Sequence, residues 1–403
     1  MKCTLAKTSN PFHMSVLFGI DHLLQLAAVE WKKSKIGLVT NEAATTHAIE
    51  PTRLVLQQAG FNIRKLFSPE HGLNVKGADG APMHNGVDEL TDLPVISLYG
   101  QKLAPDQTDL EDLDCLVFDV PDVGVRFYTY LWTLSYLLEA CAKYRKPLII
   151  LDRPNPISGL ADLQEGPFLE ELCASFIGRW NIPLRHSCTL GELALYFNET
   201  RGIKTDLTVI PCQYWSRSMF QSDWEIPFVP TSPAIQTAES LLLYPGLCLL
   251  EATNLSEGRS TDFSFEAVGA PWLQHEKLAR QINQLFGEEL EAKPVHFIPQ
   301  DAKFAGEQCN GVHFKVKYPD TFKPVFFGLV LIRIIKDMQP DSFAWAGYKT
   351  YVNPNGINHL DKLTGIADAE KLYELPMPSF LQQCTKITSV PGWNKAIEPY
   401  LLY

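Results

Sequence analysis

The stretch that decides the fold is an apolar run ending in a carboxylate, Leu113-Asp114-Cys115-Leu116-Val117-Phe118-Asp119. A helical pattern follows over residues 129–144, and then a second apolar run, Pro147-Leu148-Ile149-Ile150-Leu151-Asp152. Apolar runs without alternation, separated by helices, are typical of parallel strands that are covered on both faces. This stretch therefore predicts an α/β fold with a mostly parallel, Rossmann-like sheet.

The same alternation is expected on its N-terminal side. Residues 16–31 have apolar side chains at helical spacing, and residues 35–40 form a short apolar run. Residues 51–59 begin with proline and are followed by Gly60, which predicts a helix. Further strands are expected at residues 63–67 and 93–98.

The pattern changes after Pro156 and again from Gly269 onward. After Pro156 the chain is irregular and rich in proline, with one clear helical pattern at residues 190–197, and an apolar run covers residues 241–252. We expect a further group of elements beyond Gly269: helices at 273–286 and 327–338, and strands at 295–298 and 312–316. With 403 residues the chain exceeds the usual size of one core, so we expect a Rossmann-like domain at 1–265 and a smaller α+β domain at 266–403.

Composition excludes several classes of function. Apolar residues make up 46% of the chain and charged residues 20%, as in globular proteins, and the net charge of −11 argues against a nucleic-acid partner. The sequence contains no Gly-x-Gly-x-x-Gly, P-loop or Gly-x-Ser-x-Gly motif, so neither a nucleotide cofactor nor the commonest serine hydrolase of this layout is expected. No Cys-x-x-Cys or His-Glu-x-x-His spacing supports a metal, and we predict no cofactor.

The nine cysteines are odd in number, widely spaced and mostly set among apolar neighbours, which predicts buried thiols. Residues 1–19 lack a compact apolar segment followed by a cleavage site, and no membrane span is expected. The prediction is a cytoplasmic protein, or a periplasmic or secreted one if a signal has been removed. The oligomeric state is left open.

Ionisable and polar residues gather at or just after the ends of the predicted strands. They are Asn41, Glu70, Tyr99, Asp119 with Asp122, and Asp152 with Arg153. In an open parallel sheet the carboxyl ends share one edge, and ligands bind there. The strongest candidate for a functional site is the run Leu66-Phe67-Ser68-Pro69-Glu70-His71-Gly72, because it places a carboxylate and an imidazole in one turn. The alternative is that Glu70 caps the following segment and that His71 is a surface residue.

Several ordered motifs resemble the exo-acting β-N-acetylmuramidases, glycoside hydrolases formerly described as a bacterial domain of unknown function. The matching text is Ser68-Pro69-Glu70-His71-Gly72, Asp119-Val120-Pro121-Asp122-Val123-Gly124-Val125-Arg126-Phe127-Tyr128-Thr129-Tyr130, Leu151-Asp152-Arg153-Pro154-Asn155-Pro156, Tyr244-Pro245-Gly246, Thr253-Asn254 and Ser256-Glu257-Gly258-Arg259. The resemblance implies release of N-acetylmuramic acid from the non-reducing end of peptidoglycan fragments, in cell-wall turnover or recycling. It also implies a cleft between the Rossmann-like domain and the smaller domain, with a small carbohydrate as the partner.

Glycoside cleavage usually needs two carboxyl groups, one of which protonates the leaving oxygen. On the resemblance, Glu70 is the candidate acid, and His71 either positions Glu70 or touches sugar. The second group is left open among Asp122, Asp152, Glu251, Glu257 and the hydroxyl of Tyr128, and the substrate's own 2-acetamido group is a further alternative. The distance from Glu70 to the nearest other carboxyl would separate these mechanisms.

N-acetylmuramic acid carries a lactyl carboxylate, which a guanidinium recognises bidentately. Arg126, Arg153 and Arg259 are the candidates, and the alternative for each is pairing with a nearby carboxylate to hold a loop. For Asp152 and Asn155 the alternative is a turn before proline. The full set of candidate substrate-binding residues is Asn41, Arg126, Asp152, Arg153, Asn155, Glu251, Asn254, Glu257 and Arg259.

Two other functions compete with a glycosidase. One is a non-catalytic protein that binds a muropeptide or another anionic sugar. The other is a metal-assisted hydrolase that uses His71, Asp119 and Asp122, although their spacing matches no recognised metal motif.

Overall fold

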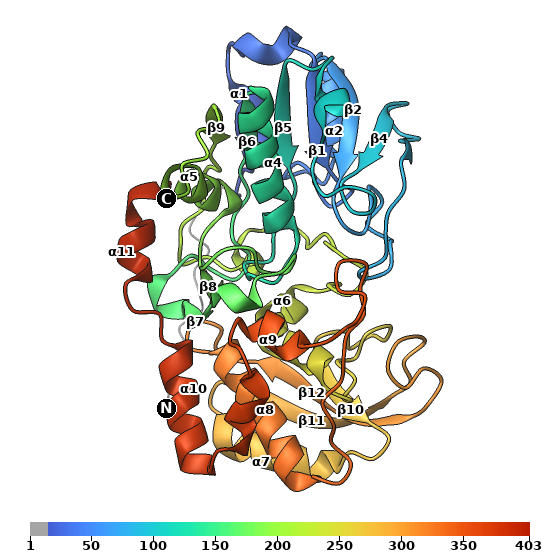
Figure 1. Ribbon diagram of the computed structural model, residues 1–403, viewed down its shortest axis with the longest axis vertical. Helices are drawn as coiled ribbons and strands as arrows, with labels where there is room; N and C mark the ends of the chain where they lie inside the picture. The colour runs from blue at the N-terminus through green and yellow to red at the C-terminus, as the bar shows by residue number, and fades with distance from the viewer. Residues whose placement is uncertain (1–14) are drawn as a thin grey trace, which may run out of the picture.

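The computed structural model describes residues 15–403, so Cys3 and most of the N-terminal segment considered above lie outside the described residues (Figure 1). A seven-stranded sheet in the order β3-β4-β2-β1-β5-β6-β9 forms the N-terminal half. All neighbouring strands are parallel except β3 and β4. The strands are β1 Ile36–Thr40, β2 Ile63–Ser68, β3 Gly86–Val87, β4 Pro94–Ser97, β5 Cys115–Asp119, β6 Leu148–Leu151 and β9 Leu207–Ile210. The predicted α/β class with a mostly parallel sheet is confirmed.

Strand β1 lies at the point where the chain changes direction across the sheet. Its neighbour β2 is on one side and β5 on the other, and every residue of β1 and β5 is buried. The loops after these strands therefore part from each other and leave room at the carboxyl edge, where open α/β sheets bind ligands.

The helices of this half are α1 Gly19–Gln25, α2 Thr52–Gln58, α3 Gln107–Leu110, α4 Tyr130–Tyr144 and α5 Leu190–Thr200. Helix α1 is shorter than the helix predicted over residues 16–31. Ile20 and Leu23 are buried, whereas Leu24 and Leu26 are more than a third exposed. The apolar spacing continues past Gln25, but the later apolar side chains have no core surface against which to pack.

The C-terminal half is built around a three-stranded antiparallel sheet in the order β10-β12-β11 (Figure 1, lower part). Its strands are β10 Ala267–Ala270, β11 Leu290–Phe297 and β12 Cys309–Val316, and its helices are α6 Ala238–Leu247, α7 His275–Phe286, α8 Pro324–Met338, α9 His359–Thr364, α10 Met377–Thr388 and α11 Trp393–Ile397. Between the halves, β7 Glu165–Phe168 and β8 Pro183–Arg185 form a two-stranded sheet. Helices α3, α9, α10 and α11 and strands β3 and β7 to β10 were not predicted from the sequence.

Helices α6 and α8 approach closely because both carry glycine at the contact. A Cβ on Gly246 would collide with the carbonyl oxygen of Pro324, and one on Gly328 would collide with the backbone of Gly246. This packing fixes the segment Cys248–Ala252, which follows α6 and carries Glu251.

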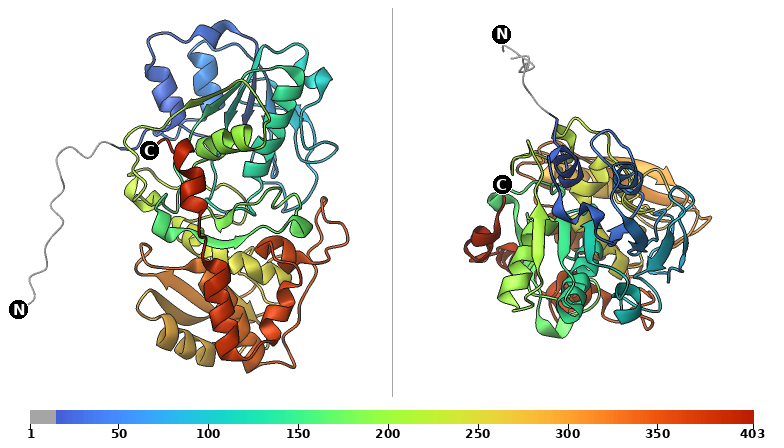
Figure 2. Two further views of the ribbon diagram at one scale, coloured as in Figure 1. Left: turned by 60° about the vertical axis from the view of Figure 1, so that its left-hand side comes forward. Right: turned by 90° about the horizontal axis from the view of Figure 1, so that it is seen from above.

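The end of the chain returns to the N-terminal sheet, where α11 lies near α5 (Figure 2, left). The hydroxyl of Tyr403 donates a hydrogen bond to Asp152 Oδ2 at 2.8 Å and accepts one from the backbone N–H of Cys212 at 2.8 Å. The eight cysteines among the described residues are buried and unpaired, which confirms the prediction of buried thiols for them. Within residues 15–403, no helix is long and apolar enough to cross a membrane.

Candidate active site

A cavity lies where the carboxyl ends of β2 and β4 and the start of α4 meet segments of the C-terminal half. Five of the predicted site residues line it: Glu70, His71, Tyr128, Glu251 and Arg259. The other lining residues that bear on its chemistry are Asp79, Tyr99, Thr129, Tyr244, Phe265, Tyr348, Thr350 and His359. The structure thus joins motifs that are up to about half the chain length apart.

Glu70 follows the end of β2 by two residues and is almost completely buried. The backbone N–H of Gly80 donates to Oε1 at 2.9 Å, and the hydroxyl of Thr129 donates to Oε2 at 2.6 Å. Burial raises the pKa of Glu70 and the charge of Asp79 raises it further, against lowering effects from His71 and the two hydrogen bonds. Each carboxyl oxygen has two lone pairs, so Glu70 can keep both hydrogen bonds and still carry a proton.

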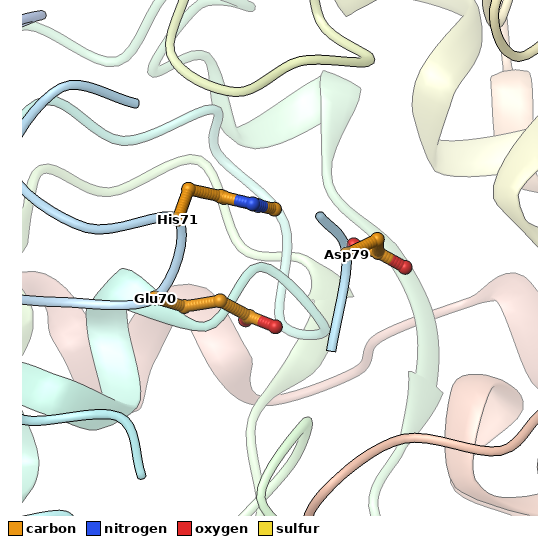
Figure 3. A group of neighbouring side chains, drawn as sticks. All are labelled: Glu70, His71 and Asp79. Atoms are coloured by element: carbon orange, nitrogen blue, oxygen red, sulfur yellow. The ribbon is translucent and has the colours of Figure 1, made fainter. Parts of the chain in front are cut away.

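His71 adopts a left-handed backbone conformation with φ of 65°. Its Nδ1 lies 2.9 Å from the carbonyl oxygen of Gly77. A carbonyl oxygen only accepts, so Nδ1 carries a hydrogen and donates it to Gly77. Figure 3 shows the side chains of Glu70 and His71 extending in the same direction from the turn.

Asp79 shares this part of the cavity, although sequence reasoning did not single it out. One atom each of Glu70, His71 and Asp79 lies within 4.8 Å of the other two, and Figure 3 shows both other side chains extending toward Asp79. Tyr348 donates its hydroxyl hydrogen to Asp79 Oδ2, and Nη2 of Arg259 lies 3.5 Å from the same oxygen. Among residues 15–403, Glu70, His71 and Asp79 also form the group of side chains close enough together to hold a metal ion.

Arg259 is itself held by two buried carboxylates. Its Nε donates to Glu257 Oε1 at 2.9 Å, and its Nη2 donates to Glu251 Oε1 at 2.5 Å. The other oxygen of Glu251 lies 2.9 Å from His359 Nε2. Burial alone would raise the pKa of Glu251, but Arg259 and His359 outweigh burial and lower it to about 2. Glu251 is therefore ionised, which does not suit a proton donor.

Two of the tyrosines that line the cavity, Tyr99 and Tyr128, were singled out from the sequence. Burial raises the pKa of Tyr99, and the charge of Glu70 raises it further. Tyr128 donates its hydroxyl hydrogen to Thr231 Oγ1 at 2.9 Å, and burial raises its pKa as well. Tyr128 thus reaches the cavity with its ring, while its hydroxyl is directed at Thr231.

Asp122 lies in a second cavity, beside Arg153, Trp224 and Thr231, at the edge formed by the ends of β1 and β5. Its Oδ2 accepts a hydrogen bond from Gly124 at 2.9 Å, and its buried Oδ1 has no partner among the described residues. Burial raises the pKa of Asp122 to about 7. The structure does not bring Asp122 to Glu70.

Arg153 also belongs to that second cavity and is paired in two places with Asp119, from Nε at 2.5 Å and from Nη2 at 3.0 Å. Asp119 is fully buried by this pairing. The metal trio of His71, Asp119 and Asp122 that the sequence suggested is therefore corrected: the three side chains are not gathered, and Asp119 is committed to a guanidinium.

Four other predicted binding residues hold backbone instead of lining the Glu70 cavity. Arg126 donates to the carbonyl oxygens of Pro167, Ile182, Leu363 and Thr364 and has no exposed surface. Asp152 accepts from Thr189 and Gly191, next to the Tyr403 contact. Asn155 accepts the backbone N–H of Ile157, which is the turn expected as the alternative to substrate binding. Asn254 pairs with the backbone of Ser342 and Ala344.

Asn41 and Glu257 are not among the lining residues of the cavity. Asn41 follows β1 and accepts the backbone N–H of Ala43 at 3.1 Å, and its amide nitrogen is buried without a partner among residues 15–403. Glu257 accepts from Arg259 and from Lys303 Nζ at 3.2 Å. Its place in the site is to hold Arg259.

Sequence reasoning missed Asp79, Thr129, Tyr348 and His359 as site residues. Thr129 stands inside a quoted motif and directly before a predicted helix, which was a usable signal. Asp79 is in a polar loop without periodicity. Tyr348 and His359 come from a segment more than 250 residues after Asp79 in the chain. Only the fold reveals that these positions meet.

Comparisons with known proteins identify the family. Two family models match, described as exo-β-N-acetylmuramidase NamZ, N-terminal, over residues 36–239, and exo-β-N-acetylmuramidase NamZ, C-terminal, over residues 242–403. The peptidoglycan β-N-acetylmuramidase NamZ of Bacillus subtilis (strain 168) is 40% identical over 326 residues, which are 81% of this chain and 78% of that protein.

Solved structures show the same fold. A DUF1343 family protein from Bacteroides fragilis NCTC 9343 superposes with a TM-score of 0.85 at 26% identity, covering 96% of this chain and 99% of its own. A second protein of that family from the same organism has a TM-score of 0.70 at 25% identity, covering 97% and 99%. The two family models together span most of the described chain, and we conclude that the protein belongs to the exo-β-N-acetylmuramidase NamZ family.

Proposed function

We propose that this protein releases N-acetylmuramic acid from the non-reducing end of peptidoglycan fragments and that Glu70 is the general acid of the reaction. Membership of the family and the Bacillus subtilis relative make the chain a peptidoglycan β-N-acetylmuramidase, an exo-acting glycosidase. The observation that carries the role of Glu70 is its burial in the cavity, which raises its pKa and favours the protonated form.

The acid acts when the bond between the anomeric carbon and the leaving oxygen breaks. Glu70 donates its proton to that oxygen, so the leaving sugar departs as a neutral alcohol. Thr129 and Gly80 fix both carboxyl oxygens, which keeps the proton at a defined position. His71 is held through Nδ1 and acts as a positioning group beside Glu70.

Arg259 is the group that we propose for the lactyl carboxylate. Of the three candidate arginines, it is the one that lines the Glu70 cavity. Its Nε and Nη2 are occupied by Glu257 and Glu251, whereas Nη1 has no hydrogen-bond partner among residues 15–403. A substrate carboxylate would take this free edge, and a sugar without the lactyl group would leave it unpaired.

Glu70→Gln tests the role of Glu70 as the acid. Glutamine keeps the shape of the side chain and one oxygen that accepts a hydrogen bond, but it has no acidic proton to donate. With a muropeptide-derived disaccharide as substrate, we expect kcat to fall on the order of 10³-fold while calorimetric binding changes little. Glu288→Gln, at an exposed position outside the cavity, is the matched control and should keep full activity. Full activity of Glu70→Gln would remove Glu70 from the mechanism.

The non-catalytic alternative has its own outcome. Tight calorimetric binding of the disaccharide without any release of N-acetylmuramic acid over hours would favour a binding protein. Activity that disappears in chelator and returns with one divalent ion would favour a metal at Glu70, His71 and Asp79. The recycling role and the cytoplasmic location stay predictions. Fractionation of cells, followed by assay of each fraction, would test the location.

A further inference from the structure

A carboxylate that no motif indicated lies beside Glu70. Asp79 lies in the loop between β2 and β3, on the same cavity as Glu70. A carboxylate oxygen of Asp79 lies within 4.8 Å of a carboxylate oxygen of Glu70 and of a ring nitrogen of His71. The candidates that the sequence offered are less suitable, because Asp122 and Asp152 do not line this cavity and Glu251 is enclosed by Arg259 and His359.

The environment of Asp79 differs from that of Glu70. Neutral donors, a hydroxyl and a backbone N–H, serve Glu70 in a buried position. The side chain of Asp79 is 35% exposed, and the cation of Arg259 and the hydroxyl of Tyr348 both approach its Oδ2. The two carboxyl groups therefore have different surroundings, which is the arrangement by which paired carboxyl groups take different roles.

The position of Asp79 is fixed from the C-terminal half of the molecule. Arg259 is anchored by Glu251 and Glu257, and the ring of Tyr348 stacks on His359 with centroids 4.7 Å apart. The next residue, Gly80, accepts the backbone N–H of Tyr351 at 2.8 Å and donates its own to Glu70. With both fixed contacts on Oδ2, Oδ1 has no partner among the described residues and is free to react.

We propose that Asp79 is the nucleophile that works with Glu70 and that the enzyme retains the anomeric configuration. The inference rests on the proposed function. Retaining glycosidases have carboxyl groups about 5 Å apart, and inverting ones need about 6.5 to 9.5 Å to admit a water molecule. The distance of no more than 4.8 Å between a carboxylate oxygen of Glu70 and one of Asp79 agrees with the retaining class.

The reaction then has two steps. Asp79 Oδ1 forms a bond to the anomeric carbon as the bond to the leaving oxygen breaks, and Glu70 gives its proton to that oxygen. The glycosyl ester on Asp79 is then attacked by water, which transfers its proton to Glu70 as the ester bond breaks. N-acetylmuramic acid leaves in the β configuration, Asp79 is again a carboxylate and Glu70 is again protonated.

The test combines product stereochemistry with azide rescue, using a β-muramide with a good leaving group. By proton NMR, the wild-type enzyme should first form the β anomer. Asp79→Ala should lose turnover on the order of 10³-fold or more and, with added azide, should yield the α-muramyl azide. Asp320→Asn, at an exposed position outside the cavity, is the control and should behave as wild type. Unchanged circular dichroism of Asp79→Ala shows that the fold is intact.

Initial formation of the α anomer overturns the proposal, because the reaction would then invert. Absence of the α-azide product in folded Asp79→Ala also overturns it and assigns the nucleophilic role to the acetamido group of the substrate. Glu70→Ala keeps the two claims apart: with azide it should give the β-muramyl azide if Glu70 is the acid. A β-azide from Glu70→Ala without an α-azide from Asp79→Ala removes only Asp79, whereas no activity of the wild type on any muramide removes the proposed function.

Discussion

The hydroxyl of Thr129, the residue directly before helix α4, donates a hydrogen bond to Glu70 Oε2 at 2.6 Å. This bond lowers the pKa of Glu70 against the dominant effect of burial. Replacing Thr129 by valine keeps the shape and removes the donor, so the pKa of Glu70 should rise further. The alkaline limb of kcat against pH, which falls as Glu70 loses its proton, should therefore move to higher pH, with kcat at the optimum reduced several-fold.

Thr129→Ser is the control for this prediction, because serine keeps the hydroxyl and should keep the wild-type pH profile. If the alkaline limb of Thr129→Val stays in place or moves to lower pH, then the group that titrates on that limb is not Glu70.

Gly80 is the second support of Glu70, and its backbone conformation demands glycine. Its φ is 66°, and a Cβ there would lie 2.6 Å from the side chain of Thr350. Gly80→Ala should therefore displace the N–H that Glu70 accepts and lower kcat by at least tenfold. Gly202 has a similar φ of 62° with open space around it, so Gly202→Ala carries the backbone strain of about 1 kcal/mol without touching the site. Equal kcat values for the two variants would contradict a role of Gly80 in positioning Glu70.

The parallel sheet could be predicted because each of its central strands is a continuous apolar run. Strand β1 was expected at 35–40 and is found at Ile36–Thr40, and β5 was expected at 113–119 and is found at Cys115–Asp119. Strand β9 has no fully buried residue, so its sequence carries a weaker signal and it was missed. The apolar composition of buried strands makes them easy to predict, whereas edge strands are harder to predict from composition.

The site was predicted in part for a related reason. Glu70 stands at a strand end, where position alone marks it, and a recognised motif surrounds it. Asp79 is placed in the site by the bond from its neighbour Gly80 to Glu70 and by Tyr348 and Arg259, which reach it from distant segments. Arg126 stands in an equally recognisable motif, yet it holds backbone carbonyls instead of lining the cavity. A motif marks a residue as important without saying whether it binds ligand or supports the fold.

Arg126 provides a test of that distinction. Its guanidinium binds four carbonyl oxygens, two of them at strands β7 and β8 and two, from Leu363 and Thr364, at the end of α9. Lysine at this position has three donors at one point and cannot serve all four. Arg126→Lys should lower the free energy of unfolding by about 3 kcal/mol or more in urea titrations. The KM of the folded variant should be unchanged.

Arg280→Lys, at an exposed position on α7, is the matched control for stability. A raised KM of Arg126→Lys at wild-type stability would mean that Arg126 binds substrate after all.

Asp122 should make stability depend on pH, because it is buried beside the unprotonated ring of His186 and burial raises its pKa to about 7. In the unfolded chain Asp122 ionises near its ordinary pKa of 3.8, so between these two values the folded protein holds a proton that the unfolded chain has lost. Stability is therefore greatest below this window and falls as pH rises through it, by at most about 4 kcal/mol.

Asp122→Asn can keep the hydrogen bond from Gly124 and removes the titration of this side chain. In urea titrations it should match the wild type near pH 4 and exceed its stability at pH 8, whereas Asp320→Asn should follow the wild type throughout. A wild-type protein equally stable at pH 5 and pH 8 would show that Asp122 is ionised at little cost.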